Sequence, residues 1–342
     1  MRKLRLVVCF LFVIAAFLLS MHLTATAQSE KILKIATVAP QGSSGWQAMY
    51  DAGVEIAQAT GGHVKIHIYP GGVMGNDSAV LKKIRVNQLQ GGSFTAGGIS
   101  EVYRDFQVMS LPMLFRNYDE VDYVRPQIVP ILAQDLEDKG YFPVAITEVG
   151  FAYMMSNTPI RSLADMKGKR VWIPEGDPIS ESAFHMMGVP PTPRPISDVL
   201  TGLQTGMIDT FANSPIGTIA LQWYTKVKYL TDAPLVYTYG TVVFSKSSLA
   251  ELSDADRKAV KQIMKKHMDD WDKTTRRENA KAMETLKKQG IQIISVSDAD
   301  QKAMENVSQK ATQDLVSKNL FSLDLVKKIQ NLLATYRASK GK

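Results

Sequence analysis

Cysteine is nearly absent from this chain: the only one, Cys9, lies in an apolar run near the N-terminus. Three basic residues precede that run, Leu6–Leu19, and the small residues Ala25-Thr26-Ala27 follow it. This pattern is typical of a secretory signal peptide, and we predict that residues 1–27 are removed on export to the periplasm. The rival interpretation, a membrane anchor, would need about 20 apolar residues. Export would leave a chain without cysteine, which excludes disulfides and thiol catalysis.

An excess of charge of one sign is also missing. Removing the signal peptide takes away three of the 40 basic residues and no acidic one, which leaves 37 basic against 33 acidic residues and a net charge of +4. Lysine and arginine are spread along the predicted helices, so no nucleic-acid partner is expected. The remaining 315 residues are long enough to build two lobes around their own cores.

Motifs for metals, nucleotides and hydrolysis are lacking as well. The sequence has no Gly-x-Ser-x-Gly and no His-Glu-x-x-His. His63 and His67 lie in an alternating strand pattern without a nearby third ligand, which does not favour a metal site. The glycines of Pro70–Asp77 are not followed by Gly-Lys-Ser/Thr and therefore predict a connecting loop. We predict no metal, no cofactor and no catalytic residue.

What is present is a compact β-α-β-α-β unit between residues 148 and 215. A strand, Lys169–Ile173, stops at a proline, and Asp177-Pro178 then supplies an N-cap and a first helical residue. The proline-rich Val189–Pro195 must be extended. Units of this kind bind ligands where strands end and helices begin. The side chains predicted at those ends are Trp172, Glu175, Asp177 and Asn213.

Short motifs along the chain resemble the solute-binding proteins of TRAP transporters, the DctP-type family. They are Pro70-Gly71-Gly72, Leu111-Pro112-Met113-Leu114-Phe115, Asn157-Thr158-Pro159-Ile160, Asp165-Met166-Lys167-Gly168, the strand ending at Pro174, Leu203–Asp209 and Asn213. The resemblance covers nearly the whole mature chain. It implies an α/β fold of the two-lobed periplasmic binding protein type, with a long helix spanning both lobes. The predicted amphipathic helix Asp254–Gln289 has the required length.

One departure from the family pattern concerns the ligand. In most of the family an arginine stands two residues before the proline matched to Pro174 and clamps the ligand's carboxylate, whereas this chain has Trp172. A second arginine, often found after the glycine matched to Gly150, is replaced by Phe151. We expect Trp172 to line the cleft and stack on a ligand that is larger, more apolar or less anionic than a C4-dicarboxylate. The alternative is a purely structural core position. Any carboxylate on the ligand would need a partner other than the family arginine: Arg194, a main-chain N–H or a helix N-terminus.

Further ligand contacts are expected from aromatic and polar side chains at the ends of predicted strands. Tyr153 and Phe94 are possible aromatic neighbours of Trp172, and Trp46 follows the first strand but begins an apolar helix stripe, which favours a core position. The complete predicted ligand-binding set is Trp172, Asn213, Glu175, Tyr153, Phe94, Glu148, Trp46 and Asp177.

The predicted division of the chain follows these motifs. Residues 28–148 form the first part of lobe I, 149–236 form lobe II, 237–270 return to lobe I and start the spanning helix, and 271–342 complete that helix, a lobe II strand and the C-terminal helices. Hinges are expected near Glu148–Gly150 and Tyr237–Thr241.

The resemblance implies a monomeric periplasmic protein that captures a small organic solute between its lobes and delivers it to a TRAP membrane permease. Two alternatives remain open. One is a ligand sensor for a membrane receptor. The other is a periplasmic hydrolase with paired carboxylates, although an N-cap role for Asp177 and a structural role for Asp209 make it the less favoured interpretation. The carboxylates near the predicted cleft are Glu148, Glu175, Asp177 and Asp209.

Overall fold

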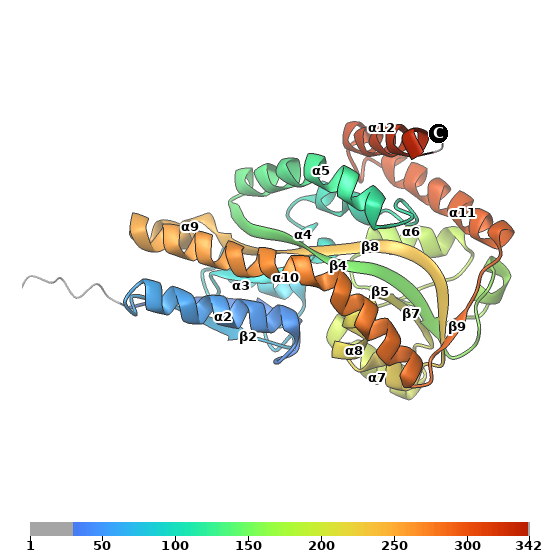
Figure 1. The fold of residues 1–342 in the computed structure, drawn as a ribbon, viewed down its shortest axis with the longest axis horizontal. Helices are drawn as coiled ribbons and strands as arrows, with labels where there is room; N and C mark the ends of the chain where they lie inside the picture. Colours follow the sequence, from blue (N-terminus) through green and yellow to red (C-terminus); the bar gives the residue numbers. More distant parts are fainter. Residues whose placement is uncertain (1–29, 341–342) are drawn as a thin grey trace, which may run out of the picture.

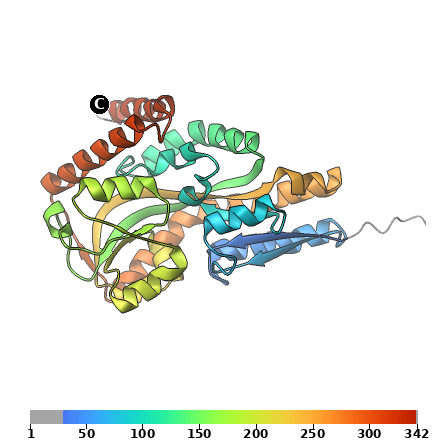
Figure 2. The same ribbon diagram turned by 180° about the vertical axis from the view of Figure 1, so that it is seen from behind.

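The computed structural model describes residues 30–340, so the predicted signal peptide lies outside the described residues. In the part of the chain that the structure describes, no helix is long and apolar enough to cross a membrane. Two long neighbouring strands, β4 and β8, run through the middle of the molecule, with helices packed around them (Figure 1). Seen from behind, β1 and β2 lie in one half and the segment that includes α6 and α7 lies in the other (Figure 2).

One mixed sheet connects both halves in the order β2-β1-β3-β8-β4-β7, and β9 also pairs with β8. The strands β5 and β6 form a small separate sheet, which a single bridge from Val171 to Thr210 joins to β7. The strand bounds are β1 Lys31–Thr37, β2 Val64–Tyr69, β3 Gly91–Thr95, β4 Tyr141–Ser156, β5 Trp172–Pro174, β6 Thr192–Arg194, β7 Thr210–Asn213, β8 Tyr229–Ser245 and β9 Gln292–Ile294.

The helices cover both faces of these sheets. The α-helices are α2 Ser44–Ala59, α3 Asp77–Arg85, α4 Ala96–Ile99, α5 Tyr118–Asp138, α6 Pro178–Met186, α7 Val199–Thr205, α8 Pro215–Ala220, α9 Lys246–Ala250, α10 Asp254–Lys288, α11 Asp298–Ser317 and α12 Leu323–Lys340. Four short 3₁₀ helices, η1 Arg104–Ser110, η2 Leu163–Met166, η3 Ile196–Asp198 and η4 Trp223–Lys226, complete the described elements.

The strands β4 and β8 belong to both lobes, because they pair antiparallel from Tyr141↔Ser245 to Ser156↔Tyr229. Their side chains are buried along almost the whole length, as expected for strands covered on both faces. The register shifts between Glu148 and Gly150, the segment at which the lobe boundary was predicted. The predicted strand 141–147 therefore continues to Ser156, since Gly150, at φ 109°, carries the backbone through the irregularity without breaking the pairing.

The long helix predicted to span both lobes is confirmed as α10, which has 35 residues and at 1.5 Å per residue is about 52 Å long. It packs against α2 and β4 in its first part and against α8 further on. Figure 1 shows α10 bending near its middle. The hydroxyls of Thr274 and Thr275 both donate to the carbonyl of Trp271, at 2.9 and 3.1 Å, and back-bonding of this kind bends helices.

Candidate functional site: the cleft between the lobes

A cleft of about 950 Å³ lies between the two lobes. One wall comes from the loop before α3, the first turn of α3, the α4 segment and η1. The facing wall comes from the loop between β5 and α6, from β6 and η3, and from the segment joining α8 to η4. Most of these contributions are the ends of strands and the first turns of helices, where backbone groups and short polar side chains reach the surface.

The cleft contains three cationic side chains that have no ion pair or hydrogen bond to another described residue: Lys82, Arg104 and Arg194. Lys82 and Arg104 belong to the lobe I wall, and Arg194 ends β6 on the facing wall. All three are exposed to solvent. An exposed cation without a partner keeps its hydrogen-bonding capacity for an anion that enters the cleft.

Two predicted carboxylates, Glu175 and Asp177, do line the cleft. Each receives a hydrogen bond from the opposite wall: Asn76 Nδ2 donates to Glu175 Oε2 at 2.8 Å, and Gln107 Nε2 donates to Asp177 Oδ1 at 3.0 Å. Asp177 also caps α6 by accepting from the amide of Ile179 at 3.1 Å. Burial raises the pKa of Asp177, although its hydrogen bonds oppose the shift. The cleft thus has two polar cross-links.

Trp172 lies behind the cleft wall and not on its surface, with only 6% of its surface exposed. Its indole Nε1 donates to the carbonyl of Arg194 at 2.9 Å. Its ring packs edge-on against Trp223, with centroids 5.1 Å apart. These contacts differ from the expected stacking on a ligand, because the ring fits the apolar core beneath β5 and β6. They connect Trp172 to two residues that do line the cleft, Arg194 and Trp223.

Three other predicted residues lie close to the sheet. Tyr153 on β4 is directly opposite Asn213 on β7, and both are half-buried. The side-chain oxygen of Asn213 accepts from the amide of Ser214 at 2.8 Å, and burial raises the pKa of Tyr153. Phe94 is 2% exposed in the lobe I core, packed against Gly92, whereas its neighbour Thr95 reaches the cleft.

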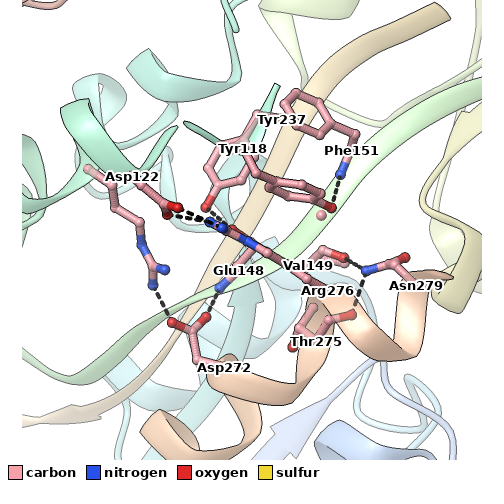
Figure 3. Close-up of polar contacts among 12 residues, drawn as sticks. Tyr118, Asp122, Glu148, Val149, Phe151, Tyr237, Asp272, Thr275, Arg276 and Asn279 are labelled. Atoms are coloured by element: carbon pink, nitrogen blue, oxygen red, sulfur yellow. Dashed lines mark hydrogen bonds and ion pairs between the residues drawn. The ribbon is translucent and has the colours of Figure 1, made fainter. Parts of the chain in front are cut away.

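Glu148 is buried in an ion-pair network where β4 meets α10 (Figure 3). Arg276 donates from Nε to Oε1 at 2.9 Å and from Nη2 to Oε2 at 3.0 Å, and the hydroxyl of Tyr237 donates to Oε2 at 3.1 Å. Arg276 also forms two hydrogen bonds to Asp122, and these, followed by its bonds to Glu148, raise its pKa. The Glu148 carboxylate is thus fully engaged by structural partners.

The backbone next to Glu148 is held by the same helix. The side chain of Asp272 accepts from the Glu148 amide, and its other oxygen lies 2.8 Å from Arg125 Nη2. Asn279 Nδ2 donates to the carbonyl of Val149 at 2.8 Å, as Figure 3 shows. The predicted hinge segments, 148–150 and 237–241, are paired neighbours in this region.

Trp46 lies on α2 and not on the cleft. It stacks on Tyr50, one turn further along, with ring centroids 5.0 Å apart and planes inclined by 19°. The inner face of α2 is formed instead by Met49, Ala52 and Ile56.

Asp77 and Gln107 line the lobe I wall but were not indicated by the sequence. Gly97 and Gly98 of α4 also line it, in the small-residue segment 91–98 where the sequence does predict a close approach of the backbone to a ligand. The turn cluster 70–77, interpreted as a plain connection, ends in the N-cap Asn76 and places that first helical turn on the cleft. No sequence pattern indicated a binding role for Gln107, because it lies inside an apolar run.

The carboxylates considered for hydrolysis have structural partners. Asp209 accepts from the amide of Arg170 at 3.0 Å and lies 3.1 Å from its Nη2 atom. Within residues 30–340 no group of three or more His, Cys, Asp or Glu residues is arranged to hold a metal ion.

Comparison with known proteins agrees with this geometry. The family model described as bacterial extracellular solute-binding protein, family 7, matches residues 35–319. The chain is 26% identical over 284 residues to the 2,3-diketo-L-gulonate-binding periplasmic protein of Escherichia coli (strain K12), covering 81% of this chain and 84% of that protein. It is also 26% identical over 247 residues to the C4-dicarboxylate-binding periplasmic protein of Rhodobacter capsulatus, covering 71% and 74%.

Solved structures share the fold. The sugar acid binding protein of Advenella mimigardefordensis in complex with galactonate superposes with a TM-score of 0.83 at 20% identity, covering 90% of this chain and 99% of that one. A TRAP periplasmic solute binding protein of Haemophilus influenzae with bound L-gulonate gives a TM-score of 0.80 at 22% identity, covering 88% and 99%. The expected two-lobed fold is confirmed.

Proposed function

Because the chain belongs to family 7 of the bacterial extracellular solute-binding proteins, we propose that its cleft captures a small organic acid and presents it to the membrane permease of a TRAP transporter. Relatives of this fold carry galactonate and L-gulonate, and others are named for diketogulonate or C4-dicarboxylates. These ligands share a carboxylate. The question for this chain is which group takes the carboxylate in the absence of the usual arginine.

Arg194 is the observation that carries the proposal. Its guanidinium is exposed on the cleft wall and has no partner among the described residues. A guanidinium offers two parallel N–H donors that match a carboxylate. The flanking Pro193 and Pro195 restrict the backbone on both sides, and the indole of Trp172 holds the Arg194 carbonyl. Trp172 thus acts as a positioning residue for the cation that replaces the family arginine.

Closure of the lobes supplies the delivery step. Two hydrogen bonds, Asn76 to Glu175 and Gln107 to Asp177, connect the facing walls of the cleft. The paired segments 148–150 and 237–241 would act as the hinge about which these walls move. A ligand that contacts both walls favours the closed form by its higher affinity for that form. The permease then recognises the closed, loaded protein.

The remaining parts of the proposal concern the setting. The protein would act in the periplasm as a monomer, after cleavage behind Ala27, and would release its ligand unchanged. The described members of the family are binding proteins, and the cleft carboxylates have the structural partners given above. Mature protein from a secreting host should begin at Gln28.

The test is titration calorimetry of the mature protein against aldonates, keto acids, C4-dicarboxylates and neutral polyols. We expect an acid to bind, and Arg194→Gln to weaken its binding about 10- to 100-fold, as loss of a hydrogen-bonded charge predicts. Arg170→Gln is the matched control, since Arg170 pairs with Asp209 and does not line the cleft. Binding of neutral polyols alone, or equal affinities in both variants, would refute the proposal.

A further inference from the structure

The lobe I wall of the cleft has acceptor atoms whose donors are missing. Gln107 is 3% exposed, and its Nε2 is committed to Asp177. Its Oε1 is buried and has no hydrogen-bond partner in the part of the chain that the structure describes. If the amide were flipped, its oxygen would face the Asp177 carboxylate, and two acceptors would repel each other. The hydrogen bond to Asp177 therefore fixes the orientation in which Oε1 is the atom without a donor. A buried acceptor without a donor is unusual and points to a missing group.

Asp77 is the second acceptor on this wall. One oxygen accepts from the hydroxyl of Thr95 at 3.1 Å, and no cation among residues 30–340 pairs with the carboxylate. Burial raises the pKa of Asp77 to about 6, and the Thr95 bond opposes this only partly. Its carboxylate therefore has lone pairs to spare at neutral pH.

Two glycines of α4 lie against these two side chains. A Cβ atom on Gly98 would lie 1.7 Å from Asp77 Oδ2, and a Cβ on Gly97 would lie 3.0 Å from Gln107 Nε2. The side chains of Asp77 and Gln107 thus lie directly against these consecutive residues of α4. A residue larger than glycine would take up the space that the two side chains occupy. All four residues line the cleft.

We propose that Asp77 and Gln107, packed against Gly97 and Gly98, form a subsite for solute hydroxyl groups, so that the ligand is a polyhydroxylated organic acid. This rests on the proposed function, with Arg194 on the facing wall taking the carboxylate. Hydroxyls supply the donors that the acceptors lack. An apolar chain in the same place would leave both acceptors without a donor. Lys82 and Arg104 already provide positive charge on the same wall, so neutral hydroxyls suit it better than an ammonium group.

Calorimetry with D-galactonate and hexanoate, two six-carbon acids that differ in their hydroxyls, tests the subsite. Wild type should bind galactonate at least about tenfold more tightly than hexanoate, and Asp77→Asn and Gln107→Met should each weaken galactonate binding about tenfold, the loss expected for one or two hydrogen bonds. Glu251→Gln, at an exposed acid that does not line the cleft, should change binding less than about twofold. Circular dichroism checks that each variant is folded.

The pH dependence gives a second readout. Wild-type affinity for galactonate should fall as the pH drops through about 6, since protonation of Asp77 weakens it as an acceptor, and Asp77→Asn should not show this fall. Galactonate binding unchanged in both variants, or hexanoate binding as tightly as galactonate, overturns the subsite while Arg194 still binds acids. Failure of every acid to bind wild type overturns the proposed function itself.

Discussion

Trp172 combines an apolar contact with one specific hydrogen bond. Replacing it by phenylalanine keeps an aromatic ring near Trp223 but removes the donor to the Arg194 carbonyl. We expect Trp172→Phe to lower the free energy of unfolding by about 1 kcal/mol, the usual net value of one hydrogen bond, and to weaken acid binding through a less ordered Arg194. Urea unfolding and calorimetry measure the two effects. Unchanged acid binding would mean that the indole does not position Arg194.

The buried pair of Glu148 and Arg276 predicts a second effect at the scale of one residue. Arg276→Met leaves a 1% exposed carboxylate with one neutral donor, the Tyr237 hydroxyl. Because Arg276 is itself one-third exposed, we expect a loss of about 2–4 kcal/mol in the free energy of unfolding, below the full value for a buried pair. Lys273→Met removes an exposed pair with Asp270 and should leave the free energy of unfolding nearly unchanged.

Residue-level prediction worked where a local rule places a side chain. Glu175 and Asp177 reach the cleft because Pro174 ends a strand and Asp177-Pro178 starts a helix, and both facts are visible in the sequence. Glu148 could not be assigned in the same way. Its partner Arg276 is 128 positions away, and only the crossing of β4 and α10 brings them together. The unpaired oxygen of Gln107 depends on an equally remote contact, with Asp177.

At the scale of elements, Gly150 is the critical position of β4. Its φ is 109°, and a Cβ atom there would lie 2.6 Å from Asn279 Nδ2 and 3.0 Å from the Tyr118 hydroxyl. Gly150→Ala should therefore lower the free energy of unfolding by about 2–4 kcal/mol, from backbone strain and displacement of the Asn279 bond to Val149. Thermal or urea unfolding provides the measurement.

Gly206 offers a matched control for that substitution. It also has a positive φ, 74°, but nothing lies within 4 Å of a Cβ atom built on it. Gly206→Ala should cost only the conformational part, about 1 kcal/mol. Equal losses in the two variants would show that the α10 contact contributes nothing at Gly150.

Elements with a long, clear periodicity of apolar residues were predicted well. Elements whose ends depend on the dihedral angles of one residue were not. The helix predicted over 254–289 is observed as α10, since an amphipathic stripe over ten turns leaves little ambiguity. The helix predicted over 216–229 is instead α8 followed by η4. Gln222 between them has a φ of 59°, a left-handed conformation that glutamine rarely adopts and that the sequence therefore did not predict.

For the whole molecule, the hinge geometry predicts a measurable change of shape. A saturating acid should close the lobes, and small-angle scattering should then report a smaller radius of gyration than for the ligand-free protein. The ligand is the acid selected by calorimetry, and Arg194→Gln with the same acid at the same concentration serves as control. Identical radii with and without bound ligand in wild type would indicate a rigid pocket.

The two-lobed plan was predictable from the alternation of strands and helices and from the resemblance to TRAP solute-binding proteins. The β-rich run Pro234–Ser245 was expected to cross back between the lobes, but the sharing of β4 was not predicted, because the predicted strand 141–147 stopped at the presumed lobe boundary. A strand pattern shows which residues alternate, but gives no sign that one sheet continues through a change of lobe.

That sharing has a consequence for the order in which the protein can fold as it is made. β8 pairs with β3 in one lobe and with β4 and β9 elsewhere, so neither core can close before residues 229–245 have left the ribosome. The first two-thirds of the chain would remain without stable tertiary structure during synthesis, as long-range pairing delays folding. A chain in that state can be threaded through a secretion channel. A fragment of residues 28–228 should accordingly show no cooperative unfolding transition, in contrast to residues 28–342.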